Sequence, residues 1–187
     1  SIHRAFVAAR IPIAYSQGFN PHPRMAFGPP LPLGACGMRE YFDVAATGNI
    51  GEEWTDVNRW LPRDLEVIEC ISCNHKPSSI TSSLKAGEYL VRFTDEIGEK
   101  DIERAVDEFK KQSRIVVTLE KKGRTVEKDI APMVTGLEKV MLSGCPGLRA
   151  RLSLAPDRTC RPADLLAKLF PGRSPSSFAV TRMECLL

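Results

Sequence analysis

The chain has 187 residues, of which 43% are hydrophobic and 26% are charged, and its formal net charge is +3. This composition predicts a protein with a substantial core and an ordinary soluble surface, long enough for one large domain or two small ones. No apolar run approaches the roughly 18 residues that a membrane-spanning helix needs, and no signal-peptide pattern opens the chain. Because it starts at Ser1, without Met and within a helical pattern, we expect the natural N-terminus to lie upstream.

Cysteine usage and charge distribution add to this picture. The six cysteines are scattered rather than spaced as a disulfide framework, so we expect free thiols and a cytoplasmic protein. Residues 139–187 carry eight Lys and Arg against three acidic residues, whereas residues 1–138 are slightly acidic. A basic C-terminal third is compatible with a phosphate-bearing partner, and equally with a solvated face.

The first half of the chain contains fewer regular elements than the second. Apolar residues have helical spacing over residues 2–10, and a proline-rich segment follows over residues 11–34. The pattern then predicts a strand over residues 39–46, a short helix over 52–60 and a strand over 65–73. This order lacks only the first strand of a βαββαβ unit.

A serine-rich stretch over residues 76–87 is the expected junction between two halves. After it, helices are expected over residues 99–112 and 162–170, the second with Pro at its first position. Strands are expected over residues 89–94, 114–120, 125–130, 137–142, 148–154 and 177–186. The predicted fold class is therefore α+β, with two ferredoxin-like βαββαβ halves packed side by side. They comprise residues 1–76, without a leading strand, and 77–187, with an inserted hairpin turned at Lys122 and Gly123.

The proline-rich segment is the expected centre of a site. Its six prolines and three glycines exclude a helix or a central strand, while its aromatic residues argue against disorder. A long ordered loop of this kind is often functional. The residues that could contact a substrate are Tyr15, Gln17, Phe19, Asn20, His22 and Arg24.

Two charged groups in the second half could complete the site. Arg161 precedes the proline that opens a predicted helix, where a cation is disfavoured unless it has an anionic partner, either Asp129 or a ligand phosphate. Arg149 and Arg151 fall on one face of a predicted strand and could form a stripe with Arg161. His22, fixed between two prolines, could grip an anion or move a proton, or its loop could simply bond its own backbone.

The Cys70 and Cys73 pair, with His75 nearby, invites a metal or redox interpretation. A zinc ribbon needs a second pair, which is missing, and a redox pair prefers a helix N-terminus. In the predicted strand the two cysteines would point to opposite faces. We therefore expect a structural role and no metal.

The motif Ala14-Tyr15-Ser16-Gln17-Gly18-Phe19-Asn20-Pro21-His22-Pro23-Arg24, followed by Leu31-Pro32-Leu33-Gly34 and Glu40-Tyr41-Phe42-Asp43-Val44, resembles the bacterial family of radical-SAM-linked proteins. Later similarities are Leu61-Pro62, Leu65-Glu66-Val67, Asp129-Ile130 with Pro132, and Arg161-Pro162. Members of this family usually begin with a strand and a Ser-His-Leu-Asp segment, which this sequence lacks. They occur fused to, or encoded beside, radical SAM enzymes.

The resemblance implies an accessory module without a cofactor of its own. Its partner enzyme would carry an iron–sulfur cluster and S-adenosylmethionine, and the module would present a substrate, which we expect to be RNA. One alternative is an RNA-processing or RNA-modifying enzyme that uses His22 and Asp129. Another is a domain that only docks a protein through the proline-rich loop.

Overall fold

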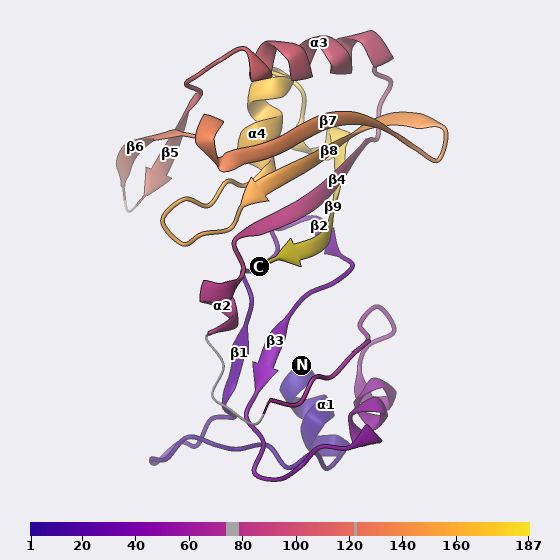
Figure 1. Cartoon of the computed structure of the whole chain (residues 1–187), viewed down its shortest axis with the longest axis vertical. Coiled ribbons are helices and arrows are strands. Elements are labelled where there is room, and N and C mark those ends of the chain that lie inside the picture. Colours follow the sequence, from indigo (N-terminus) through magenta and orange to yellow (C-terminus); the bar gives the residue numbers. More distant parts are fainter. Residues whose placement is uncertain (74–78, 122) are drawn as a thin grey trace. The chain divides into compact units, whose positions relative to one another are not determined.

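The computed structural model describes residues 1–73, 79–121 and 123–187 of the chain, which separates into two compact units (Figure 1). Unit 1 comprises Ser1–Phe27 and Phe42–Thr81, and unit 2 comprises Gly28–Tyr41 and Ser82–Leu187. The segment Gly28–Tyr41 thus leaves unit 1 and joins the other unit. The expected boundary at residues 76 and 77, like His75 and the turn residue Lys122, lies outside the described residues.

Unit 1 is built on a small sheet and two short helices. The strands β1 (Met25–Phe27) and β3 (Phe42–Val44) pair antiparallel, and α1 (Ile2–Ala8) packs with the 3₁₀ helix η1 (Glu52–Trp60). The short helix α2 (Ile80–Ser83) spans the change from unit 1 to unit 2. In the described part of unit 1, the core is formed by five buried residues, namely Ala5, Phe6, Ile11, Ile13 and Val57.

The strand predicted over residues 65–73 is wrong, because this segment has no regular secondary structure. Its backbone is held by a side chain instead of a neighbouring strand. Asn58 of η1 donates from Nδ2 to the carbonyl of Val67 at 2.9 Å, and the Val67 N–H donates to Asn58 Oδ1 at 2.7 Å. A side-chain amide that satisfies both backbone groups of a residue replaces the ladder bonds of a strand.

Unit 2 contains a five-stranded sheet in the order β2-β9-β4-β8-β7. Only β2 and β9 pair in parallel, and the remaining neighbours are antiparallel. The strands are β2 (Ala35–Gly37), β4 (Ala86–Phe93), β7 (Val134–Leu142), β8 (Cys145–Ser153) and β9 (Phe178–Leu186). The hairpin of β5 (Val116–Lys121) and β6 (Arg124–Asp129) forms a separate two-stranded sheet, followed by the 3₁₀ turn η2 (Ala131–Met133).

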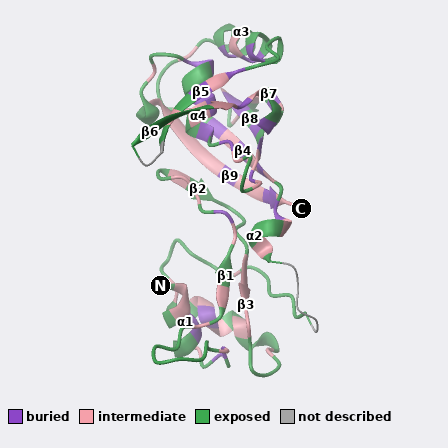
Figure 2. Ribbon diagram, turned by 90° about the vertical axis from the view of Figure 1, so that its left-hand side faces the viewer, coloured by how far each residue is buried: buried purple, intermediate pink, exposed green. Residues whose placement is uncertain are grey.

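The helices α3 (Glu99–Lys110) and α4 (Pro162–Leu169) cover one face of this sheet, and the 3₁₀ turn η3 (Pro175–Ser177) leads into β9 (Figure 1). Figure 2 shows buried positions along β4 and β8. They alternate along the strands beneath the helices and include Tyr89, Val91, Leu148 and Ala150. Among the described residues, the main hydrophobic cluster of unit 2 contains 18 buried residues. We call the opposite side of the sheet, which carries Glu88, Arg149 and Arg151, the outer face.

The segment Gly28–Tyr41 is fastened to the sheet of unit 2 by a buried arginine. Arg182 of β9 has no exposed surface; its Nε donates to Glu40 Oε1 at 2.8 Å, and its Nη2 to Glu40 Oε2 and to the Pro29 carbonyl. The Met38 N–H donates to the Arg182 carbonyl at 2.9 Å. These bonds accompany the pairing of β2 with β9 at the sheet edge, and Leu33, near the middle of the segment, is fully exposed.

The mixed α+β class is confirmed, but the arrangement of two ferredoxin-like halves is not. Where unit 1 is described, it has no strand of the length that a βαββαβ unit needs, since β1 and β3 have three residues each and residues 65–73 form none. Among the residues described, no helix has both the length and the apolar character needed to cross a bilayer.

Candidate functional site

The proline-rich segment contains an ordered loop in unit 1, residues 16–22, which we call the tip loop. Tyr15 and Pro23 form an antiparallel bridge at its base. The Ser16 N–H donates to the His22 carbonyl at 2.8 Å, and the His22 N–H donates to Ser16 Oγ at 2.9 Å. One pair of residues therefore closes the loop twice, which fixes how the residues between them project.

The tip loop presents its side chains outward. Gly18 has φ +136, a conformation that side-chain-bearing residues rarely adopt, and the next residue, Phe19, is fully exposed. The polar candidates Gln17, Asn20, His22 and Arg24 are exposed as well, and their side chains make no hydrogen bond or ion pair with the described chain. An aromatic ring surrounded by unpartnered polar groups is suited to contact a ligand through stacking and hydrogen bonds.

Tyr15 differs from the other candidates of this segment because it contacts α1. Its hydroxyl lies 3.2 Å from Nε2 of His3, and the two rings meet edge to face at 6.1 Å between centroids. Tyr15 nevertheless keeps 44% of its surface exposed. It can therefore contribute an apolar edge beside the tip loop, but it also holds the loop against α1.

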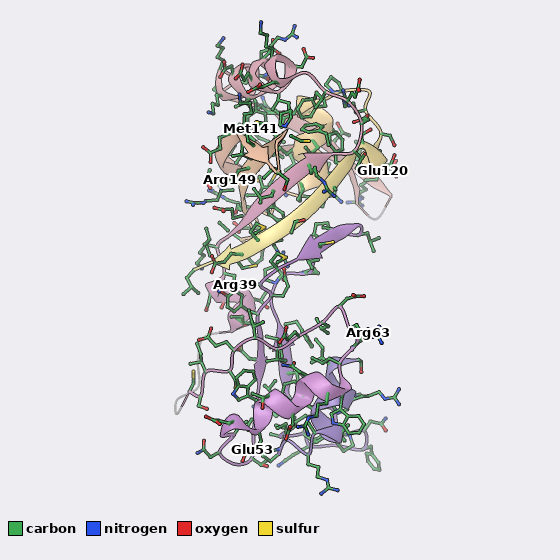
Figure 3. All side chains as sticks on the ribbon, turned by 90° about the vertical axis from the view of Figure 1, so that its right-hand side faces the viewer. Arg39, Glu53, Arg63, Glu120, Met141 and Arg149 are labelled. Carbon is green, nitrogen blue, oxygen red and sulfur yellow. The ribbon has the colours of Figure 1, made fainter. Side chains whose placement is uncertain are left out.

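Arg149 and Arg151 lie together on the outer face of unit 2, as strand alternation predicts. Both are half exposed, and Figure 3 shows Arg149 extending away from β8. Both are also ion-paired. Arg149 lies 3.3 Å from a Glu138 oxygen and 3.8 Å from Glu88, and Arg151 lies 3.6 Å from Glu88. A phosphate that binds here would compete with these two carboxylates.

Sequence reasoning missed Arg92, which alternation on β4 places on the same outer face as Glu88. Arg92 is exposed and has no hydrogen bond or ion pair within the described part of the chain. Its neighbours across the strands are Gly147 and Ala179, whose small size leaves the guanidinium accessible. Alternation along β4 places Arg92 on the face of Glu88. The register between β4 and β8 places that face beside Arg149 and Arg151, and this register cannot be derived from the sequence of β4 alone.

The sequence suggests Asp129 or a ligand phosphate as the partner of Arg161, but the structure shows a different one. It caps α4 and forms a two-point pair with Asp164, at 2.9 Å from Nε and 2.7 Å from Nη2. This hydrogen bonding raises the pKa of the Arg161 guanidinium. Because α4 covers the face opposite Arg149 and Arg151, the three arginines do not form one stripe.

The Asp129 carboxylate accepts hydrogen bonds from backbone N–H groups around it. Its Oδ1 accepts the N–H of Ile115 at 2.9 Å and that of Ala131 at 3.1 Å, which joins the β5–β6 hairpin to η2. Of the two partners considered for Arg161, Asp129 is therefore not the one that the described structure shows. His22 belongs to unit 1 and Asp129 to unit 2, so a catalytic pairing of the two stays a prediction.

The described cysteines are not arranged as a redox pair, a catalytic nucleophile or a metal site would require. All six are free, as predicted. Cys70 and Cys73 are exposed in the irregular segment, but partial desolvation of the Cys70 thiol raises its pKa, which disfavours a reactive thiolate. Burial also raises the pKa of Cys160 to about 12. Within residues 1–73, 79–121 and 123–187, no three His, Cys, Asp or Glu side chains gather as a metal site would require.

Comparison with known proteins gives a family without an assigned activity. We found no match among curated proteins and none among solved structures. The family described as "Uncharacterized protein conserved in bacteria (DUF2344)" matches residues 1–162. These residues include all of unit 1, the tip loop, and unit 2 as far as the first residue of α4. The chain therefore belongs to the DUF2344 family of proteins conserved in bacteria.

Proposed function

We propose that this protein is a non-catalytic module that binds single-stranded RNA. The observation that carries the proposal is the fully exposed Phe19 ring on a loop closed by two hydrogen bonds. Stacking of a base on such a ring contributes about 1–3 kcal/mol, and it needs no particular sequence. Gln17, Asn20 and His22 supply donors and acceptors for base edges beside it.

Unit 2 would supply the electrostatic part of binding. We propose that it is a ferredoxin-like domain, because its elements β4-α3-β7-β8-α4-β9 have the spatial strand order β9-β4-β8-β7. Its outer face would contact the RNA backbone through Arg92, Arg149 and Arg151. Of the three, Arg92 requires no carboxylate to be displaced, so it is the stronger candidate for a phosphate contact.

The partner in this proposal is a cytoplasmic radical SAM enzyme, which would hold the iron–sulfur cluster and S-adenosylmethionine. Support for this part comes from the sequence motif of the tip loop and from the second motif, around Leu33 and Glu40. In this arrangement the module holds the RNA, and all bond-changing chemistry belongs to the partner.

The test measures how tightly the protein binds a fluorescein-labelled, single-stranded RNA of random sequence. Binding is measured by fluorescence anisotropy at several salt concentrations. Phe19→Ala should weaken binding about 5- to 100-fold, the equivalent of one lost stacking contact. Arg92→Ala should flatten the slope of log K against log salt by about 0.7, as for one phosphate contact on a single strand.

Leu33→Ala is the matched control, because Leu33 is equally exposed and also lies beside a glycine with positive φ, Gly34. It should leave RNA affinity unchanged. Absence of measurable RNA binding, or binding that does not depend on salt, would exclude the RNA proposal.

Leu33 favours a second candidate function, the docking of a protein. Phe19 and Leu33 are two fully exposed apolar residues on hydrogen-bonded segments, as expected for side chains that insert into a partner. Docking predicts that Phe19→Ala and Leu33→Ala both weaken association with the radical SAM enzyme while RNA affinity is unchanged. The enzyme alternative predicts turnover of RNA by the isolated protein and its loss in His22→Ala.

A further inference from the structure

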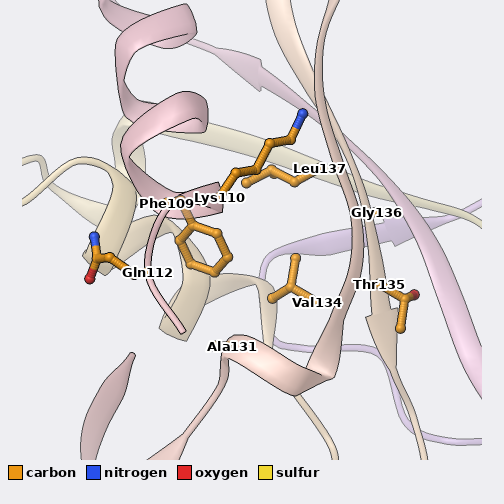
Figure 4. Close-up of a pocket in the computed structure, with 8 residues that line it drawn as sticks. All are labelled: Phe109, Lys110, Gln112, Ala131, Val134, Thr135, Gly136 and Leu137. Carbon is orange, nitrogen blue, oxygen red and sulfur yellow. The ribbon is translucent and has the colours of Figure 1, made fainter. Parts of the chain in front are cut away.

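A pocket of about 250 Å3 lies in unit 2 between the end of α3 and the start of β7 (Figure 4). Its apolar surface comes from Phe109 and Leu137, which are more than nine-tenths buried, and from Val134 and Ala131. In Figure 4 the Phe109 ring and the Val134 side chain point toward one another, and Lys110 extends from α3 toward β7. The pocket therefore has an apolar floor with one cation at its rim.

The pocket adjoins a free sheet edge, because β7 is the last strand of the five-stranded sheet. The turn Ser143-Gly144, in which both residues have positive φ, joins β7 to β8 and sets the register. In such a two-residue hairpin the pair Leu142–Cys145 is hydrogen-bonded, and bonded and non-bonded pairs then alternate. The backbone groups of Leu137, Lys139 and Met141 consequently face away from β8 and are available to an added strand.

Charge at this edge favours an acidic occupant. Lys139 is neutralised by Glu99 and Glu103 of α3, with 2.6 Å between its Nζ and Glu103 Oε1. By contrast, Lys110, Lys111 and Arg114 are exposed and make no ion pair within the described residues. Asp107 and Glu108 precede these three cations on α3, so two acids stand against three bases over residues 107–114 and the net charge at this end of α3 is +1.

We propose that an extended segment of a partner protein binds here by adding a strand to β7. One apolar side chain of the segment enters the pocket between Phe109 and Leu137, and a neighbouring Asp or Glu meets Lys110. Backbone bonds to the edge supply affinity, while the pocket and the cation select the sequence, as in other complexes formed by strand addition. The groove lies wholly within unit 2 and is independent of the RNA proposal.

Selection from displayed random decapeptides, with the full chain as target, tests this proposal. Enriched peptides should carry an apolar residue next to Asp or Glu. A labelled peptide from the enriched set should bind Lys110→Glu at least about tenfold more weakly than the unsubstituted chain, because the new carboxylate repels the acidic residue of the peptide. Amide exchange at Leu137 and Lys139 should slow when the peptide is bound, as expected for new ladder bonds.

Lys100→Glu is the matched control, since Lys100 is an exposed lysine near the other end of α3 that makes no ion pair with any described residue. Its effect should stay within about twofold. Failure to enrich acidic peptides, or equal effects of the two substitutions, would overturn the proposal. The proposal would also be overturned if the chain associated with itself and Met141→Pro abolished that association, because a second copy of the chain would then occupy the β7 edge. RNA affinity should be unchanged in Lys110→Glu.

Discussion

At the residue scale, the Arg182–Glu40 pair shows how a buried charge can hold a loop. Burial disfavours the charged guanidinium and is the largest single influence on its pKa, yet the bonds to Glu40 and the interactions with Tyr89 and Cys185 together outweigh it and raise the pKa of Arg182. Arg182 also donates to the Pro29 carbonyl, so one side chain binds both ends of the Gly28–Tyr41 segment. Its Nη1 atom has no partner within the described residues, which makes the bonds to Glu40 still more important.

Glu40→Gln should therefore destabilise unit 2 by roughly 2–4 kcal/mol, because it leaves the buried guanidinium without a counter-charge. Urea unfolding followed by circular dichroism measures this loss. The neighbouring pair of Arg39 and Glu184, 3.6 Å apart and exposed, provides the control. Arg39→Gln should change the free energy of unfolding by less than about 0.5 kcal/mol. Equal losses for the two variants would show that the buried pair contributes no more than a surface pair.

At the element scale, long periodic segments could be predicted and short or irregular ones could not. The helix expected over residues 99–112 is α3 (Glu99–Lys110), and the strand expected over 177–186 is β9 (Phe178–Leu186). Each strand of unit 1 has three residues, too few for an alternating pattern to define. Residues 65–73 contain the β-branched residues Val67, Ile68 and Ile71, which favour a strand, but the bonds from Asn58 to Val67 override this preference.

Residues of the candidate site could likewise be predicted where local sequence patterns place them, and could not where contacts between distant residues do. Proline and glycine positions indicate the loop around Phe19, and strand alternation places Arg149 beside Arg151. The Arg161–Asp164 pair has the (i, i+3) spacing of helix neighbours and could have been predicted. Glu40 and Arg182 are separated by 142 residues, and no local pattern connects them.

Asn58→Ala tests whether the side-chain amide organises the irregular segment. The substitution leaves the N–H and carbonyl of Val67, in a partly buried position, without partners and should cost about 1–3 kcal/mol. Hydrogen exchange at the Val67 amide should become faster. Asn49→Ala, at an exposed asparagine in the same unit, should leave that amide unchanged. Slow exchange at Val67 in Asn58→Ala would mean that packing, rather than the amide, fixes the segment.

At the scale of the whole molecule, the two units have unequal cores. Counting the residues that the structure describes, the hydrophobic cluster of unit 1 has five buried residues and that of unit 2 has 18. Buried apolar area is the main source of folding free energy, and regions with little of it open first. The tip loop therefore belongs to the less stable unit, while the arginines of the outer face and the β7 edge belong to the more stable one.

Native-state hydrogen exchange should accordingly give two classes of amides, with lower opening free energies in α1 and η1 than in β4 and β8. Phe6→Ala removes a buried ring that packs edge to face on Phe42, at 5.9 Å between centroids. It should lower the opening free energy of unit 1 by about 3 kcal/mol and leave β4 and β8 unaffected. If Phe6→Ala lowered protection equally in both units, they would unfold as one cooperative body, and the tip loop could not reorganise on binding without the sheet of unit 2.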